Sequence, residues 1–476
     1  MSEITGIVKS IRKIMRNDNG VSGDAQRMEQ IGWMLFLKIF SDKDKELEIL
    51  NDDYISPIPN EYQWDAWAGD EEGITGDDLV DFVDNKLFPT FRNLDVSSKS
   101  PRAHILRDVF TGNYNYMKKG TYLRQIINKL NQINFNNSKD KQLFGEVYES
   151  FLNELQSAGS SGEYYTPRAV VSFMTEIINP RLGEKILDTS CGTGGFLTAS
   201  IEHLKLQSKK IEDRKLIEKN VIGWEYKPLP YLLATTNLIL HDVEVPNLKY
   251  DDSLSRPLVE IGKNDEVDVI LANPPFGGDV VDGNEKNFPS IYQTKESADL
   301  FLILMIELLK TNGRAAIVLP DGSLTGDGVK ERIRKKLLED CNLHTIVRLP
   351  NSVFQPYASV ATNLLFFTKG TPTKEVWYYE HKLPEGQKAY SKTKPIQISE
   401  FDTLKSWWED RTKSEVAWKV DIETIKNNGY NLDIKNPHKV EEEEIHSSTE
   451  LLEMLHNSFA KSDELLKKLQ SELSNV

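Results

Sequence analysis

The sequence predicts an α/β protein with a doubly wound sheet, an all-helical N-terminal domain and a helical C-terminal tail. Two observations predict the sheet. The apolar run Ile186–Asp188 leads through three glycines into the helical pattern of residues 196–203, and the apolar run 267–271 ends in Asn-Pro-Pro-Phe. A third observation, helical spacing of apolar residues near both ends of the chain, predicts the flanking helices. At 476 residues, the length suggests about three domains.

Composition limits the class of protein. Hydrophobic residues make up 39% of the chain, which is enough for a large core, and no apolar run approaches the ~20 residues of a membrane helix. Residues 1–16 are amphipathic and lack the layout of a signal peptide. Cys191 and Cys341 do not have the spacing of a metal-ligand or redox pair. We therefore expect a soluble cytoplasmic protein with no membrane partner.

The first predicted domain spans residues 1–156 and is all helical. Its apolar residues repeat at helical spacing in two early segments: Ile4, Val8, Ile11 and Met15, then Met28, Ile31, Leu35 and Ile39. The helical pattern returns at residues 122–133 and 141–155. A Gly/Ser-rich stretch, 157–162, then marks a boundary.

The second predicted domain, residues 163–370, begins with a helix. Thr166 and Pro167 are typical of a helix N-cap followed by proline at the first helical position. The apolar residues that follow give this helix a buried face, made of Val170, Phe173, Met174 and Ile177.

A glycine-rich loop follows the first predicted strand, which ends in Asp188. Gly192, Gly194 and Gly195 let the loop turn and bring its backbone close to a ligand, and the next helix start offers free N–H groups. The next strand, residues 220–225, ends in Glu225, whose carboxylate could accept hydrogen bonds from two ribose hydroxyls. Several nucleotide-binding folds share this pattern, and the two acids could also be read as part of a nuclease site.

Asn-Pro-Pro-Phe is the sharper motif. It follows the buried-strand pattern 267–271, so it should lie at the carboxyl edge of the sheet, where open α/β sheets bind ligands. The prolines remove two donors and leave the side-chain oxygen of Asn273 and the carbonyl of Pro274 as acceptors. These two acceptors could hold an amino group on an aromatic ring and make its nitrogen more nucleophilic. Phe276 would offer a face for stacking a base; a rigid turn with a core Phe is the alternative.

With Gly162-Glu163-Tyr164-Tyr165-Thr166-Pro167 before them, these motifs stand in a familiar order. Over nearly its whole length the chain resembles the S-adenosylmethionine-dependent DNA methyltransferases that act on amino groups, and within them the modification subunit of type I restriction-modification systems. It departs from the usual Asp-Pro of the first motif because Thr189 follows Asp188.

The resemblance implies a methyltransferase-type sheet, S-adenosylmethionine as cofactor and transfer of methyl to N6 of a flipped adenine. It implies these cofactor-binding residues: Tyr165, Thr166, Pro167, Asp188, Gly192, Thr193, Gly194, Gly195, Glu225 and Asp252. The catalytic residues would be Asn273, Pro274, Pro275 and Phe276, with no metal. A plain helix cap at Thr166 and Pro167, and a surface turn at Asp252, are the alternatives at those positions. Cytosine N4, RNA or protein glutamine as acceptor, and a non-catalytic scaffold, also remain open.

The net charge of −15 is the wrong sign for a protein that holds DNA unaided. The resemblance implies DNA, a separate specificity subunit, a second copy of this chain and a restriction (translocase/nuclease) subunit as partners. The basic residues of the first helix could touch DNA or a partner, although a solvated face is the simpler interpretation: Lys9, Arg12, Lys13 and Arg16.

The polar stretch 277–297 follows the motif and could order over the target base or stay a mobile loop. We then expect a helix at 299–310 closed by Gly313, and strands at 314–319, 345–349 and 363–368.

Residues 371–440 form a mixed extension whose tryptophans are expected to pack on the sheet rather than stack bases: Trp377, Trp407, Trp408 and Trp418.

Residues 441–476 predict an amphipathic helix for partner docking. Ser447 and Glu450 have the spacing of a capping box. The apolar seam has heptad spacing: Leu452, Leu455, Phe459, Ser462, Leu466, Leu469 and Leu473. Such a seam must be buried against something. The resemblance favours helices of the specificity subunit over packing on the same chain.

Overall fold

The computed structural model describes residues 3–96, 100–136, 148, 165–278, 280–355, 361–391, 393–438 and single positions between 452 and 467. The chain divides into two compact units, Met1–Ile434 and Lys435–Val476. In the described parts of both units, no helix combines the length and the apolar character needed to cross a membrane.

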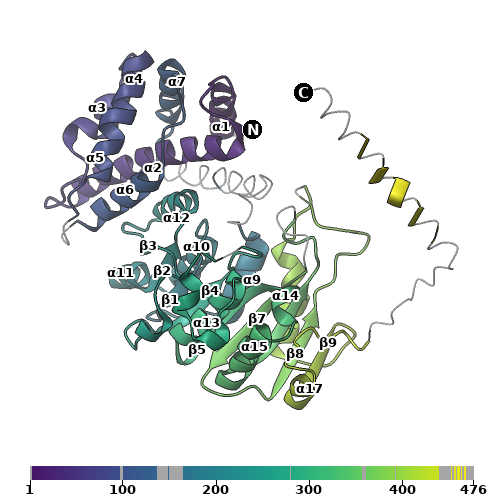
Figure 1. Ribbon diagram of the computed structural model, residues 1–476. Helices are drawn as coiled ribbons and strands as arrows, with labels where there is room; N and C mark the ends of the chain where they lie inside the picture. The colour runs from purple at the N-terminus through teal and green to yellow at the C-terminus, as the bar shows by residue number, and fades with distance from the viewer. Residues whose placement is uncertain are drawn as a thin grey trace. The chain divides into compact units, whose positions relative to one another are not determined.

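A nine-stranded sheet forms the centre of the first unit, in the order β3-β2-β1-β4-β5-β7-β6-β8-β9 (Figure 1). The strands are β1 (Ile186–Asp188), β2 (Val221–Glu225), β3 (Leu248–Tyr250), β4 (Val267–Ala272), β5 (Leu309–Pro320), β6 (Cys341–Leu349), β7 (Thr362–Lys369), β8 (Glu375–Glu380) and β9 (Ala417–Asp421). The strands from β3 to β5 are parallel, and β7 runs antiparallel between β5 and β6. The prediction of a doubly wound methyltransferase-type sheet is confirmed.

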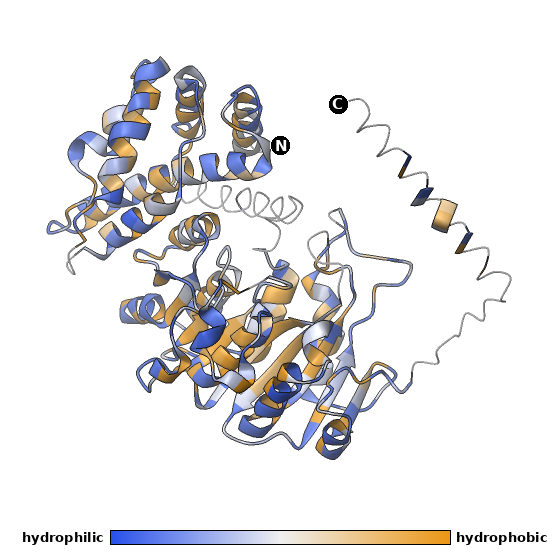
Figure 2. Ribbon diagram, viewed as in Figure 1, coloured by the Kyte–Doolittle hydropathy of each residue, from blue (hydrophilic) through white to orange (hydrophobic). Residues whose placement is uncertain are grey.

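Helices cover both faces of this sheet. They are α9 (Arg168–Ile178), α10 (Gly195–Lys205), α11 (Ile211–Asn220), α12 (Pro228–Leu240), α13 (Ser297–Leu308), α14 (Asp321–Leu324), α15 (Val329–Asp340), α16 (Asp402–Glu409) and α17 (Ile422–Asn427). In β4, Val269 and Leu271 pack in the core that contains α9 and α10, whereas Ile270 packs in the core that contains α13 and α15. Because neighbouring strand residues point to opposite faces, a continuous apolar run is buried from both sides. Figure 2 shows the central strands of the sheet largely in the orange of hydrophobic residues.

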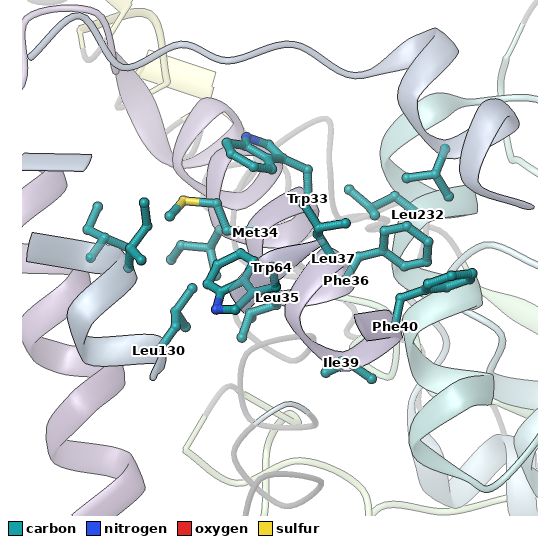
Figure 3. Packing of buried hydrophobic residues seen from close by; sticks show 14 of the residues in the cluster. Trp33, Met34, Leu35, Phe36, Leu37, Ile39, Phe40, Trp64, Leu130 and Leu232 are labelled. Atoms are coloured by element: carbon teal, nitrogen blue, oxygen red, sulfur yellow. The ribbon is translucent and has the colours of Figure 1, made fainter. Parts of the chain in front are cut away.

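The N-terminal region is helical, as predicted. It contains α1 (Glu3–Met15), α2 (Gly23–Leu50), α3 (Trp64–Ala68), α4 (Gly76–Phe82), α5 (Phe88–Arg92), α6 (Pro101–Gly112) and α7 (Gly120–Leu130). Its core joins α2 to α12, where Phe36 and Phe40 share one buried cluster with Leu232 (Figure 3). A Cβ on Gly32 would come within 2.9 Å of the Leu232 side chain, so a glycine permits this close approach. The predicted helix at 141–155 lies outside the described residues, apart from Tyr148.

The predicted helix that precedes β5 was too long. α13 ends at Leu308, β5 begins at Leu309, and Gly313 lies inside that strand instead of closing the helix. The sequence pattern could not separate the two because the apolar residues on both sides of the boundary are buried in either conformation.

Residues of the predicted extension contribute β8 and β9 to the same sheet. Trp407 and Trp418 are buried, and Trp418 stacks on Tyr378 with ring centroids 5.3 Å apart. These contacts confirm packing on the sheet rather than exposure for base stacking.

In the second unit, the described positions between 452 and 467 are helical. Leu452, Leu455, Phe459 and Leu466 are all more than half exposed. The proposed capping box at Ser447 and Glu450, and the seam positions Leu469 and Leu473, lie outside the described residues. Leucines at these spacings leave one apolar stripe on the described helical positions exposed.

Candidate active site

The glycine loop connects β1 to α10 at the carboxyl edge of the sheet. Gly192 and Gly194 have φ angles of 54° and 80°, a region that glycine enters without strain. A Cβ on Gly194 would meet the α12 backbone, at 3.4 Å from the Cα of Ala234. The amide of Asn237 in α12 donates to the carbonyl of Thr193 over 3.0 Å. The loop is therefore fixed from the helix behind it.

Two buried acids stand where β1 and β2 end. Asp188 accepts a hydrogen bond from the backbone N–H of Ser190 (3.0 Å), and Glu225 accepts from the backbone N–H groups of Gly192 (3.0 Å) and Lys227 (2.9 Å). Burial raises the pKa of Asp188 to about 8 and that of Glu225 to about 7, although these amide donors act in the opposite direction. The charge of Glu225 also raises the pKa of Asp188. A positively charged ligand would relieve the cost of ionising both carboxyls.

Asn273 follows β4 at the same edge. Its side-chain N–H donates to the hydroxyl of Thr166 over 2.9 Å, which fixes the orientation of the amide. Its oxygen, Oδ1, is buried without a hydrogen-bond partner. A buried acceptor without a partner is costly, so one in a native site calls for an explanation such as a bound ligand or water. This acceptor is the one that the sequence predicted for an aromatic amine.

The phenyl ring of Phe276 is half-buried beside this turn. It meets Phe354 edge-on, with ring centroids 5.9 Å apart and planes at 74°. Phe354 lies in the loop after β6 and is fully buried. The plane of the Phe276 ring is thus set by a residue from a distant part of the chain.

Thr166 does not cap α9. The N-cap position is occupied by Pro167, and the helix begins at Arg168. The predicted cap was therefore wrong by one residue, because the Thr166 side chain bonds to Asn273 instead of to the helix N-terminus. Tyr165 is buried in the cluster of the N-terminal helices.

Asp252 lies in the loop after β3. Its carboxylate accepts hydrogen bonds from the Leu254 backbone N–H (2.9 Å) and from the amide of Asn284 (2.7 Å). The neighbouring Ser253 lines the cleft described next and donates its hydroxyl to the carbonyl of Thr189 over 2.6 Å. The polar stretch after the motif is therefore packed against this loop, since Asn284 belongs to it.

One cleft brings most of the predicted site residues together. Eight of them line it: Thr166, Asp188, Gly192, Thr193, Gly195, Glu225, Asn273 and Pro275. The other six do not: Tyr165, Pro167, Gly194, Asp252, Pro274 and Phe276.

The cleft also contains residues that the sequence analysis did not select. They are Ser190, Cys191, Phe196, Trp224, Tyr226, Lys227, Ser253 and Phe301, together with Thr189. The hydroxyl oxygens of Thr189 and Ser190 are buried without partners. Burial raises the pKa of the Cys191 thiol, so this side chain stays uncharged. Phe301 gave no signal because nearly every residue of α13 is apolar.

The polar groups that line the cleft fit a polar ligand that carries a positive charge. Two carboxyls, two hydroxyls without partners and one amide oxygen without a partner converge in it. Within the described ranges, no group of three or more His, Cys, Asp or Glu side chains could hold a metal ion.

The fold and this site define an α/β methyltransferase, with a glycine loop and an acid after the second strand at the edge where Asn-Pro-Pro-Phe lies. Comparison with known proteins narrows the class. The N-6 DNA Methylase family profile matches residues 139–446, and the HsdM N-terminal domain profile matches residues 4–130. The chain belongs to this family and, within it, to the methylase subunits of type I restriction enzymes.

Individual relatives support the same family assignment. The chain is 52% identical to the type I restriction enzyme EcoEI methylase subunit of Escherichia coli, over 99% of this chain and 97% of that protein. A crystal structure of a modification subunit assigned to a type I restriction enzyme from Vibrio vulnificus YJ016 is 43% identical, with a TM-score of 0.82, and the match covers 92% of this chain and 97% of that one. A chain from a study of complex assembly and conformational transition in a type I restriction-modification system is 33% identical, also with a TM-score of 0.82, over 99% and 98% of the two chains.

Proposed function

We propose that this subunit transfers the methyl group of S-adenosylmethionine to N6 of an adenine that has been flipped out of DNA. The observation that carries the proposal is Oδ1 of Asn273, an acceptor buried without a partner at the carboxyl edge of the sheet. Its orientation is fixed by Thr166, so the acceptor is in place before any target arrives.

The cofactor residues would act as follows. S-adenosylmethionine supplies a methyl group on a positively charged sulfonium. The glycine loop approaches it with backbone only, while Glu225 accepts from the ribose hydroxyls. Asp188 lies at the end of β1, where its negative charge favours a positively charged ligand. Asp252 would accept from the exocyclic amine of the cofactor adenine, sharing the oxygen now bonded to Asn284. Tyr165 and Pro167 would act only indirectly, by holding Thr166.

The target amine would donate one hydrogen to Asn273 Oδ1 and one to the Pro274 carbonyl, while Phe276 stacks on the base. Both acceptors draw the nitrogen toward tetrahedral geometry, which frees its lone pair. Asn273 and the Pro274 carbonyl would hold the nitrogen toward the methyl carbon; S-adenosylmethionine would supply that carbon, and its sulfur would keep the electron pair of the broken carbon–sulfur bond. The amine then loses one proton to water, so no general base is needed.

Family membership and the acidic net charge of the chain support the proposed assembly partners. We propose that DNA is read by a separate specificity subunit, and that the complex contains a second copy of this chain and a restriction subunit. Residues 1–156 would help close around DNA, residues 163–370 would carry the chemistry, with 371–440 as its extension, and residues 441–476 would dock on the specificity subunit through the exposed leucine stripe. A cytoplasmic location is part of this proposal.

The test is transfer of labelled methyl from S-adenosylmethionine to unmethylated DNA, followed by nucleoside analysis. The chain is assayed alone and co-purified with its specificity subunit. We expect N6-methyladenine only with the partner. Asn273→Ala should lower transfer by about a hundredfold to a thousandfold, because an acceptor that stabilises developing charge is lost, while cofactor binding persists.

Three outcomes would contradict the proposal. Label on cytosine, RNA or protein would show that the methyl acceptor is not adenine. Sequence-specific activity of the chain alone would show that this chain reads the target sequence itself. Full activity of the Asn273→Ala variant would rule out a role for the Asn273 oxygen in activating the target amine.

A further inference from the structure

The segment after the Asn-Pro-Pro-Phe motif forms a loop with a closed base. The backbone N–H of Val280 donates to the carbonyl of Lys295 over 3.1 Å. Ser297 then makes two more bonds: its hydroxyl donates to the Pro275 carbonyl at 2.9 Å, and its backbone N–H donates to the Gly278 carbonyl at 3.4 Å. One residue therefore holds the chain on both sides of Phe276.

Ser297 is well placed for this role. It is the first residue of α13 and only 5% exposed. N–H groups in the first turn of a helix have no partner within the helix, and this one is used to hold the Gly278 carbonyl. Gly277, between the two held carbonyls, has a φ of 63°, so the turn needs a glycine there. The bonds fix a turn that would otherwise be free to move.

The same helix also reaches the cofactor cleft. Phe301, one turn after Ser297 on α13, lines that cleft. Residues 297–306 of α13 are all buried, so the helix is packed on every side and cannot shift without repacking the core. The first two turns of α13 thus contact both the acceptor turn, through Ser297, and the cofactor cleft, through Phe301.

We infer that Ser297 is a positioning residue for methyl transfer, and this inference rests on the function proposed above. By holding the Pro275 carbonyl, it sets the Pro274 carbonyl and the Phe276 ring at a fixed distance from the methyl donor. Transfer in line requires the reacting atoms to be close and aligned, and a displacement of about 1 Å can cost about a hundredfold in rate. Ser297 touches neither reactant; it acts through the turn.

A helix start that only stabilises the fold predicts a different result. Loss of a purely structural hydroxyl would lower the melting temperature and would weaken every activity in proportion to the unfolded fraction. Loss of a positioning bond should change the rate of the chemical step while cofactor affinity and the KM for DNA stay the same. The two are separable by measuring binding and single-turnover transfer on the same sample.

The experiment uses the full chain co-purified with its specificity subunit, as wild type, Ser297→Ala, Ser297→Cys and Ser297→Thr. Ser200→Ala is the matched control, because Ser200 is a fully buried serine in α10 whose hydroxyl has no partner. For Ser297→Ala we expect a single-turnover rate about 10 to 100 times lower. The Kd for S-adenosylmethionine and the KM for DNA should change by less than about twofold, since the cleft and DNA contacts remain. Ser297→Thr keeps the hydroxyl and should recover most of the rate, while Ser200→Ala should match the wild type.

Ser297→Cys keeps the side-chain volume with a weaker donor, so it replaces the alanine variant if that one does not fold. A wild-type rate in Ser297→Ala or Ser297→Cys would overturn the inference, and so would a loss of cofactor affinity and melting temperature in step with the rate. A wild-type complex that transfers no methyl to adenine would instead refute the proposed function, so the two failures are distinguishable.

Discussion

The helical N-terminal region and the cofactor cleft both bury polar groups, but the interactions of these groups differ between the two regions. In the helical region, Arg102 and Asp44 form an ion pair at 2.7 Å with both side chains about 5% exposed. Arg102 also donates to the Glu244 carbonyl at 2.7 Å. In the cleft, burial raises the pKa of Asp188 and Glu225, whose carboxyls accept hydrogen bonds from backbone N–H groups.

The difference separates groups that hold the fold from groups that await a ligand. A buried charge with its partner is satisfied, and removing the partner is what costs stability. A buried carboxyl with a raised pKa, or a buried hydroxyl without a partner, destabilises the empty protein and is retained where a ligand completes it. The comparison therefore predicts that substitutions in the first region lower stability, whereas substitutions in the second lower binding.

Arg102→Met should give the largest effect. It leaves Asp44 buried without its cation and also removes the bond to the loop before β3. We expect the free energy of unfolding to fall by about 3 kcal/mol or more. Chemical denaturation of the full chain measures this.

The matched control is Arg27→Met, which breaks an exposed pair with Asp24, a side chain that is 71% exposed. Exposed pairs contribute about 0–1 kcal/mol, so this variant should unfold almost like the wild type. Equal losses from the two substitutions would show that burial of the Arg102 pair does not matter.

Asp188→Asn should increase the stability of the protein at higher pH, whereas Arg102→Met lowers stability. The folded-state pKa of Asp188, about 8, lies above its unfolded value near 4, so the folded protein holds the proton more tightly than the unfolded chain. Wild-type stability therefore falls as pH rises from about 4 to about 8, and an uncharged amide removes that loss. We expect the melting temperature of the variant, relative to the wild type, to increase between pH 6 and pH 8.

The same variant should bind S-adenosylmethionine about 30-fold more weakly at pH 8, since a charged acceptor near the ligand contributes about 2 kcal/mol. Calorimetry of binding gives this value. A variant that is both less stable at pH 8 and unchanged in affinity would assign Asp188 to the fold and not to the ligand.

Sequence reasoning worked where the chemistry is local. The glycine loop, the acids Asp188 and Glu225, and the Asn273 turn are each specified within a few residues of a strand end, and parallel strands bring their carboxyl ends to one edge. Most of these residues do line one cleft.

It failed where a role depends on a contact distant in sequence. Thr166 was predicted as a helix cap, but its hydroxyl instead accepts from Asn273, 107 residues away. Phe301 could not be distinguished within an apolar helix, and Ser297 bonds backward across the loop to Pro275. The pairing of Asp44 with Arg102 likewise joins residues far apart. Only the folded chain places such residues together.

The pH dependence of cofactor binding tests the two buried acids of the cleft, Asp188 and Glu225, as a set. Burial keeps Asp188 and Glu225 protonated up to about pH 8 and about pH 7. A cationic ligand favours the carboxylates, so binding should release protons and become tighter as pH rises from 6 to 8, by about tenfold. Above about pH 8 the affinity should level off.

S-adenosylhomocysteine is the control ligand, because it has the same amino acid group without the sulfonium charge. Its affinity should rise less steeply over the same range, which separates titration of the protein from titration of the ligand. Parallel slopes for the two ligands would mean that the acids do not respond to the sulfonium.

Thr189→Val should give the smallest effect, and it tests a single hydroxyl group. The hydroxyl of Thr189 is buried in the cleft without a partner, while its carbonyl accepts a hydrogen bond from Ser253. Valine has the same shape, so it removes only the hydroxyl. If that hydroxyl bonds to the cofactor, the Kd for S-adenosylmethionine should rise about 3- to 10-fold, equivalent to one neutral hydrogen bond. Thr189→Ser should keep the wild-type affinity.

The stability of the empty protein should not fall in Thr189→Val, because no bond within the protein is lost. A clear drop in melting temperature with an unchanged Kd would instead show that this hydroxyl stabilises the fold, as the paired groups of the helical region do.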